Sequence, residues 1–107
     1  MPQEKSDIKE RQRISIDAPR MYHVIMHNDD FTTMEFVTMV LRTVFFKTAE
    51  TAEQLMLTVH KEGQAIVGVY TLDIAVSKSQ NAMRMAREQG LPFQLTWEPE
   101  EPEGLPF

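Results

Sequence analysis

Hydrophobic and polar positions divide the middle of this chain into six segments. Runs of apolar and β-branched residues predict strands, while apolar residues spaced three and four apart predict helices. In chain order we predict a strand over 21–26, a helix over about 33–46, a helix that begins at Thr48 or Thr51 and ends at Gly63, a strand over 65–71, a helix over 72–88 and a strand over 93–97.

This order, β-α-α-β-α-β, predicts a small α+β domain. Strands and helices of this kind must bury their apolar faces against one another. We therefore expect a three-stranded antiparallel sheet with three helices packed on one face. The domain is expected to span residues 21–98.

The two ends of the chain differ from this middle part. Residues 1–20 carry nine charged side chains and two prolines, a composition that predicts a flexible N-terminal arm. Residues 99–107 continue an acidic, proline-rich stretch and predict an extended tail. Three parts are expected: the arm 1–20, the core 21–98 and the tail 99–107.

Charge and composition exclude several classes of function. The net charge of −5 argues against a nucleic-acid partner, because phosphate binding needs clustered Lys and Arg. No apolar run is long enough to cross a membrane, and no signal peptide is apparent, so we expect a cytoplasmic protein. The chain has no cysteine, which excludes disulfides and thiolate metal sites.

The most informative stretch lies directly after the first predicted strand, at Asn28, Asp29 and Asp30. One interpretation is a polar turn with acids near a helix start; Thr32 and Glu35 match a capping box there, and Phe31 with Phe36 a hydrophobic staple. The other is a receptor for a cationic group. If the extended backbone continues past residue 26, Asn28 and Asp30 point the same way and Asp29 the opposite way.

Metal and enzyme chemistry find little support in the sequence. His23, His27 and His60 fit no standard ligand spacing, so we predict no metal site and no cofactor. His60 borders the apolar stripe of its helix and is either a receptor residue or a partly buried, hydrogen-bonded histidine. No phosphate loop or nucleophile motif is present, and we predict that the protein is not an enzyme.

Two segments of the chain form a distinctive combination. The first runs from Tyr22 to Val37 through Asn28-Asp29-Asp30-Phe31-Thr32, and the second is Gln54-Leu55-Met56-Leu57 with Val59-His60. Together they resemble the ClpS family, the adaptor proteins of the bacterial N-degron pathway. The likeness continues through Gly63, Ala65, Gly68 and Val69, then Asp73, Ala75, Lys78, Pro92 and Thr96, and so covers about residues 21–98.

This resemblance implies a fold similar to the C-terminal domain of the ribosomal stalk protein. It also implies an adaptor that binds substrates beginning with Leu, Phe, Tyr or Trp. Such an adaptor delivers them to the N-terminal domain of a ClpA-type AAA+ unfoldase, which feeds the ClpP peptidase. We expect a monomer.

The resemblance also assigns roles to residues. Asn28, Asp30 and His60 would contact the substrate α-amino group, and Asp29 would support the turn or the next residue. The side-chain pocket would be lined by Met26, Thr32, Met34, Val37, Met56, Val59 and Phe93. Asp73 and Lys78 would belong to the unfoldase docking region, and the arm would engage the unfoldase during transfer.

Some positions depart from the family pattern, and rival functions stay open. Phe93 stands where the family commonly has leucine, so its ring either shortens the pocket and disfavours Trp or rotates away. Val76 replaces an expected polar residue near the docking region. The principal rival is a general protein-interaction module of the same fold without an N-terminus pocket. A more distant one is a metal-dependent hydrolase that uses His60 and the aspartates.

Overall fold

The computed structural model describes residues 19–100, and its elements follow the predicted order. Most of the predicted arm (1–18) and part of the predicted tail (101–107) lie outside the described residues. The elements are β1 (Met21–His27), α2 (Met34–Thr43), α3 (Ala49–Glu62), β2 (Gln64–Thr71), α4 (Leu72–Glu88) and β3 (Gln94–Pro99). The predicted α+β class is confirmed.

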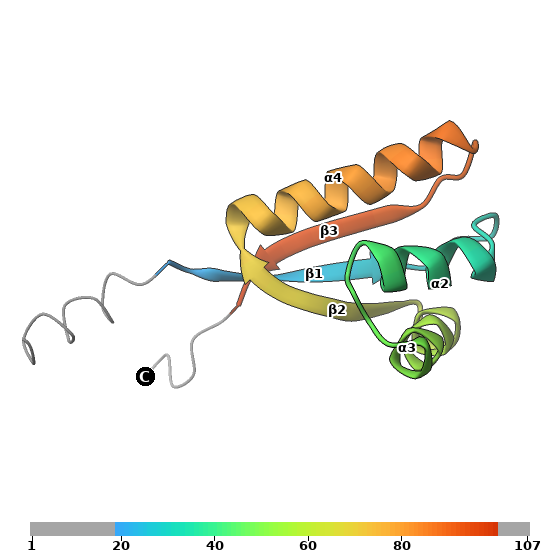
Figure 1. The fold of residues 1–107 in the computed structure, drawn as a ribbon, viewed down its shortest axis with the longest axis horizontal. Helices are drawn as coiled ribbons and strands as arrows, with labels where there is room; N and C mark the ends of the chain where they lie inside the picture. Colours follow the sequence, from blue (N-terminus) through green and yellow to red (C-terminus); the bar gives the residue numbers. More distant parts are fainter. Residues whose placement is uncertain (1–18, 101–107) are drawn as a thin grey trace, which may run out of the picture.

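The sheet has β1 in the middle, with β2 and β3 antiparallel on either side of it. Its pairing runs past residue 98, because Tyr22 pairs with Pro99 and the Glu100 N–H donates to the Met21 carbonyl at 2.8 Å. Figure 1 shows α4 running along the sheet beside β3. In the same view α2 and α3 lie at the end of the sheet where β1 finishes and β2 begins.

One hydrophobic core joins the helices to the sheet. Val24 and Met26 alternate along β1 toward the helices, and both are fully buried. They pack in a single cluster with buried residues of every helix and of the other strands, among them Val67, Leu95, Phe36, Val40, Leu41, Ala52, Val59, Ala75, Ala82 and Ala86. In the described part of the chain, no helix is both long and apolar enough to cross a membrane.

A β-bulge shapes the pairing of β1 with β2. Val24 pairs with Gly68 and Ile25 with Ile66, so Val67 is an extra residue and turns its side chain into the core. A Cβ atom at position 68 would overlap the ring of Tyr70. Gly68 therefore provides the space in which this ring packs, 6.2 Å from the ring of Phe45.

The start of α2 differs from the prediction by one residue. Thr33, rather than Thr32, caps the helix, and its Oγ1 accepts the Phe36 N–H at 3.1 Å. The expected capping box is wrong because the Thr32 hydroxyl donates to Asp29 Oδ2 at 2.6 Å. The expected staple is wrong too: a cap at Thr33 moves the staple positions off the two phenylalanines, and Phe31 is 72% exposed.

The other helix ends follow the sequence more closely, with one exception. Thr48 begins α3 by accepting the Thr51 N–H at 3.1 Å, and Gly63 ends it in the left-handed conformation at φ 91°. The exception is the end of α2, which lies at Thr43 and not near Phe46. Phe46 has φ 56°, so the backbone has already left the helix.

Replacing Gly68 with alanine should destabilise the fold by about 1–3 kcal/mol, because the new methyl group displaces the Tyr70 ring. Urea unfolding measures this cost. In a Tyr70→Ala background the same replacement should cost little. An equal cost in both backgrounds would show that the backbone at position 68, and not the Tyr70 ring, sets the requirement for glycine.

Candidate functional site

The polar segment after β1 borders a cavity of about 250 Å³. Three parts of the chain form it: the loop between β1 and α2, the first turn of α2, and the second half of α3. The residues that line it are Asn28, Asp29, Asp30, Thr32, Met34, Val37, Met56, Val59 and His60. Nine of the eleven residues predicted for the amino-group site and the side-chain pocket therefore meet at one place.

One backbone hydrogen bond holds the two polar parts of this site together. The Asn28 N–H donates to the Gly63 carbonyl at 2.9 Å, which ties the loop after β1 to the end of α3. His60 lies in the last turn of α3, one turn before Gly63. Asn28, Asp30 and His60 are all exposed, so their polar groups form an open rim. The partly buried histidine considered above is wrong.

Asp29 shapes the loop itself. Its Oδ1 accepts the N–H groups of Phe31 and Thr32 at 2.8 and 2.7 Å, and its Oδ2 accepts the Thr32 hydroxyl at 2.6 Å. Partial burial alone would raise the pKa of Asp29, but these hydrogen bonds and the charge of Arg87 lower it below its ordinary value of 3.8. The Asp29 carboxylate, which is bonded within the loop, thus differs from the exposed carboxylate of Asp30 at the rim.

The inner wall of the cavity is apolar. Val37 of α2 and Val59 of α3 are buried, and Met56 of α3 is partly buried. Met34, at the first position of α2, is 49% exposed and also borders a second hollow outside the cavity. This arrangement suits a ligand with a cationic group at the rim and an apolar group inside.

Two of the predicted pocket residues do not line the cavity. Met26 and Phe93 are both fully buried within the core. The Phe93 ring packs edge-on against Phe36, with the ring centroids 5.4 Å apart and the planes at 76°. The alternation of side chains along β1 directs Met26 toward the helices, and Phe93 points the same way where the chain enters β3. The sequence alone did not show that these buried positions lie apart from the cavity wall.

The two residues predicted for docking lie on α4, away from the cavity. Asp73 is exposed in the first turn, and a hydrogen bond from the Thr71 hydroxyl at 2.7 Å lowers its pKa. Lys78 is partly buried, and its Nζ donates to the Val44 carbonyl at 2.6 Å. Lys78 therefore connects α4 to the segment that follows α2.

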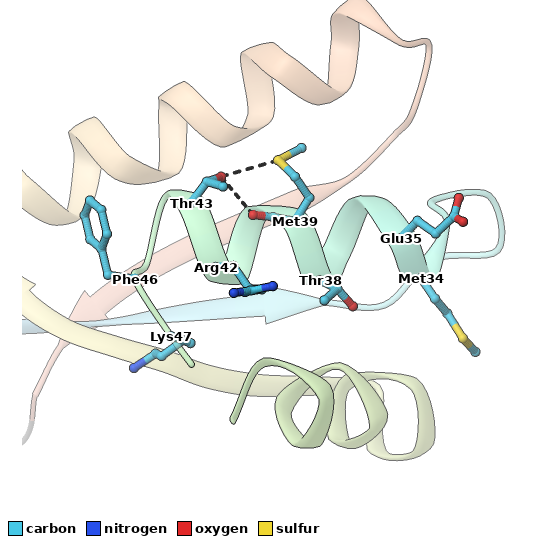
Figure 2. Close-up of a pocket in the computed structure, with 8 residues that line it drawn as sticks. All are labelled: Met34, Glu35, Thr38, Met39, Arg42, Thr43, Phe46 and Lys47. Atoms are coloured by element: carbon cyan, nitrogen blue, oxygen red, sulfur yellow. Dashed lines mark hydrogen bonds between the residues drawn. The ribbon is translucent and has the colours of Figure 1, made fainter. Parts of the chain in front are cut away.

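A larger hollow of about 700 Å³ follows the outer side of α2. Figure 2 shows the side chains along it, from Met34 and Glu35 at the start of the helix to Phe46 and Lys47 beyond its end. The sequence did not indicate this surface, because its pattern predicts Phe46 inside the helix. The signal available in the sequence was the run Val44-Phe45-Phe46. Adjacent apolar pairs recur every four residues from Phe36-Val37 to Val44-Phe45, and Phe46 falls outside this spacing.

Nothing in the described residues resembles a metal centre. Across residues 19–100, no three side chains of His, Cys, Asp or Glu come close enough together to hold a metal ion. His27 instead shares a 2.7 Å hydrogen bond with Thr96 across the strand pair. His23 lies 3.6 Å from a carboxylate oxygen of Glu100. The described residues thus contain no set of metal ligands for the hydrolase considered above.

The chain is similar to one family of known proteins in each comparison. The family model described as "ATP-dependent Clp protease adaptor protein ClpS" matches residues 17–96. ClpS adapter proteins of Acetivibrio thermocellus and Burkholderia cenocepacia are each 47% identical to the chain. The first alignment covers 91% of this chain and 98% of the relative, and the second covers 87% and 89%.

A solved structure has the same fold. It is Agrobacterium tumefaciens ClpS2 bound to L-phenylalaninamide, with a TM-score of 0.74 and 43% sequence identity. The match covers 77% of this chain and 99% of that one. The family consists of protease adaptors and not of enzymes. From the family model, the relatives and the shared fold together, this chain belongs to the ClpS family of Clp protease adaptors.

Proposed function

We propose that this adaptor binds the N-terminal residue of N-degron substrates beginning with Leu, Phe, Tyr or Trp, and that it delivers them to a ClpA-type AAA+ unfoldase. The observation that carries the proposal is the cavity described above. Its rim holds Asn28, Asp30 and His60, and its wall holds Val37 and Val59. A substrate N-terminus combines the same two features, an ammonium group and an apolar side chain.

The rim suits an α-amino group for electrostatic reasons. A free α-amino group has a pKa of about 7.7–8.0, so it is mostly cationic near neutral pH. The carboxylate of Asp30 and the amide oxygen of Asn28 accept its hydrogens, directly or through water. In its neutral form the imidazole of His60 accepts one more. Bonds of this charge-assisted kind are stronger than those between neutral groups.

The size of the cavity favours a single side chain. Its volume of about 250 Å³ is below the range of roughly 300–1,000 Å³ that accommodates drug-sized ligands. Burial of a Leu or Phe side chain contributes about 1.5–3 kcal/mol. Met34 stands at the mouth and would contact the Cβ region of the bound residue.

The Agrobacterium structure supports the same ligand class. L-Phenylalaninamide, bound there to ClpS2, carries a free amino group and an aromatic side chain, with an amide in place of the next peptide bond. These are the groups that the rim and the wall are suited to receive. Asp29 would support the bound state indirectly, through the loop that it organises.

Delivery would use other parts of the chain. The resemblance assigns docking to the region of Asp73 and Lys78, and transfer to the N-terminal arm, residues 1–20. Both Asp73 and Lys78 lie on α4, outside the cavity, so a substrate and an unfoldase can be bound at the same time. We also propose that the protein is a monomer and acts in the cytoplasm.

Acetylation of the peptide N-terminus should abolish binding, because it removes the positive charge and two of the hydrogen-bond donors. A loss on the order of a hundredfold or more is expected from the bonds involved. Fluorescence polarisation with labelled peptides that begin with Leu or N-acetyl-Leu measures this difference. Equal binding of the two peptides would contradict an ammonium receptor.

Replacing Met34 with alanine should admit peptides that begin with Ile or Val, because it opens the mouth for their second branch at Cβ. Discrimination by a single methyl group is typically about tenfold or more, so a gain of that size is expected. Met39→Ala is the matched control, since Met39 lies on the same helix and borders the outer hollow but not the cavity. If Ile and Val peptides still fail to bind, Met34 is not the gate.

Replacing Asp29 with asparagine should lower the free energy of unfolding at pH 7, by on the order of 1 kcal/mol. The pKa of Asp29 is lowered in the folded chain, so the contribution of its charge is present above the ordinary value of 3.8 and is lost as the pH falls through the folded-state pKa. The difference between wild type and variant should therefore shrink in acid. Denaturant unfolding at a series of pH values tests this, and a difference that grows in acid would contradict it.

A further inference from the structure

Phe46 occupies an unusual position for a large apolar residue. It is 77% exposed, and its φ of 56° lies in the left-handed region, which a bulky side chain rarely adopts. The neighbouring Phe45 is buried in the core. Strained backbone of this kind persists only where the surrounding structure enforces it, and it is frequent at functional sites.

Lys78 of α4 holds Phe46 in place. Its Nζ lies 4.6 Å from the centroid of the Phe46 ring and 5.5 Å from that of Tyr70, while it donates to the Val44 carbonyl at 2.6 Å. On the other side of Phe46, the Lys47 N–H donates to the Leu41 carbonyl at 2.9 Å. Lys78 thus contacts the exposed ring, and the Lys47 N–H holds the backbone that follows it.

Two hollows meet at this ring. One is the 700 Å³ hollow along α2, and the other, of about 510 Å³, lies between the end of α2 and α4. Phe46 and Thr43 line both. Figure 2 shows Phe46 and Lys47 leaving the end of α2 in different directions. The ring therefore stands as a ridge between two depressions, and a partner surface can surround it.

The charges around the ring are mainly positive. Arg42, Lys47, Lys78 and Arg84 line the two hollows, and Glu35 is the one acidic residue among the lining side chains. These are four of the seven Lys and Arg within residues 19–100; the other three are Arg20, Lys61 and Arg87. Such a concentration of cations is notable in a chain with net charge −5, and it favours an acidic partner.

We infer that Phe46 is the anchor of the surface by which this adaptor docks on its unfoldase. The complementary surface would offer an apolar pocket for the ring, rimmed by carboxylates that face Arg42, Lys47 and Arg84. Lys78 acts as a positioning residue, because its ammonium group is engaged by Val44 and the rings. This inference rests on the delivery step proposed above, and the contact of Lys78 with Phe46 makes the surface continuous with the proposed docking region.

The test compares Phe46→Ser with wild type in binding to the intact AAA+ unfoldase of the source organism, measured by biolayer interferometry with the full-length chain. Docking should weaken by at least about tenfold, as truncation of an interface anchor does. Ile66→Ser is the matched control, an apolar residue 50% exposed on β2, and it should dock like wild type. Binding of a Leu-starting peptide should be unchanged in both variants.

The charge and positioning claims have their own variants. Arg84→Gln should weaken docking and reduce its dependence on salt, while Lys61→Gln should do neither. Lys78→Met should weaken docking in wild type but add little in the Phe46→Ser background, because it acts through Phe46. Additive losses would show that Lys78 contacts the partner directly and would overturn its role as a positioning residue.

Failure of the inference can be told from failure of the proposed function. If wild type docks and Phe46→Ser docks equally well, Phe46 is not the anchor. If wild type forms a dimer that Phe46→Ser dissociates, without an effect on docking, a second copy covers the ring and the inference is overturned. If wild type binds peptides but does not dock at all, delivery itself is wrong and the inference falls with it.

Discussion

The candidate site depends on one hydrogen bond, from the Asn28 N–H to the Gly63 carbonyl. It joins the residue that leaves β1 to the residue that ends α3, two points 35 positions apart in the sequence. The left-handed backbone of Gly63 ends the helix there and turns the chain into β2, beside β1. Together with the pairing of His27 with Gln64, this junction places the acidic loop and His60 beside the same cavity.

Within the loop, neighbouring polar residues divide two tasks. The carboxylate of Asp29 accepts hydrogen bonds from Phe31 and Thr32, and these bonds fix the backbone of the loop. Its oxygens are therefore already engaged within the loop. Asn28 and Asp30 are exposed beside it, at the rim of the cavity. The structural-turn interpretation thus describes Asp29, and the receptor interpretation, which stays a prediction, concerns Asn28 and Asp30.

The sequence predicted the ends of helices well where a local capping residue sets them, and less well where tertiary packing sets them. Helix α4 spans 72–88 as predicted, and Gly63 and Thr48 mark the ends of α3, because glycine and threonine act there through their own backbone or hydroxyl. The end of α2 was misplaced, since Lys78 and the core hold Phe45 and Phe46 in a non-helical segment. Met26 and Phe93, which were predicted for the pocket, are fully buried in the core. Met26 pairs with Leu95 in the sheet and Phe93 directly precedes β3, an arrangement that no local pattern reveals.

The central claim is that the cavity beside Asn28, Asp30 and His60 receives the ammonium group and side chain of one residue. A crystal structure of this protein with L-phenylalaninamide tests it most directly. We predict the ring between Val37, Met56 and Val59, with the amino group within hydrogen-bond distance of Asn28 and Asp30. A ligand bound instead along the outer side of α2, with the cavity empty, would contradict the account.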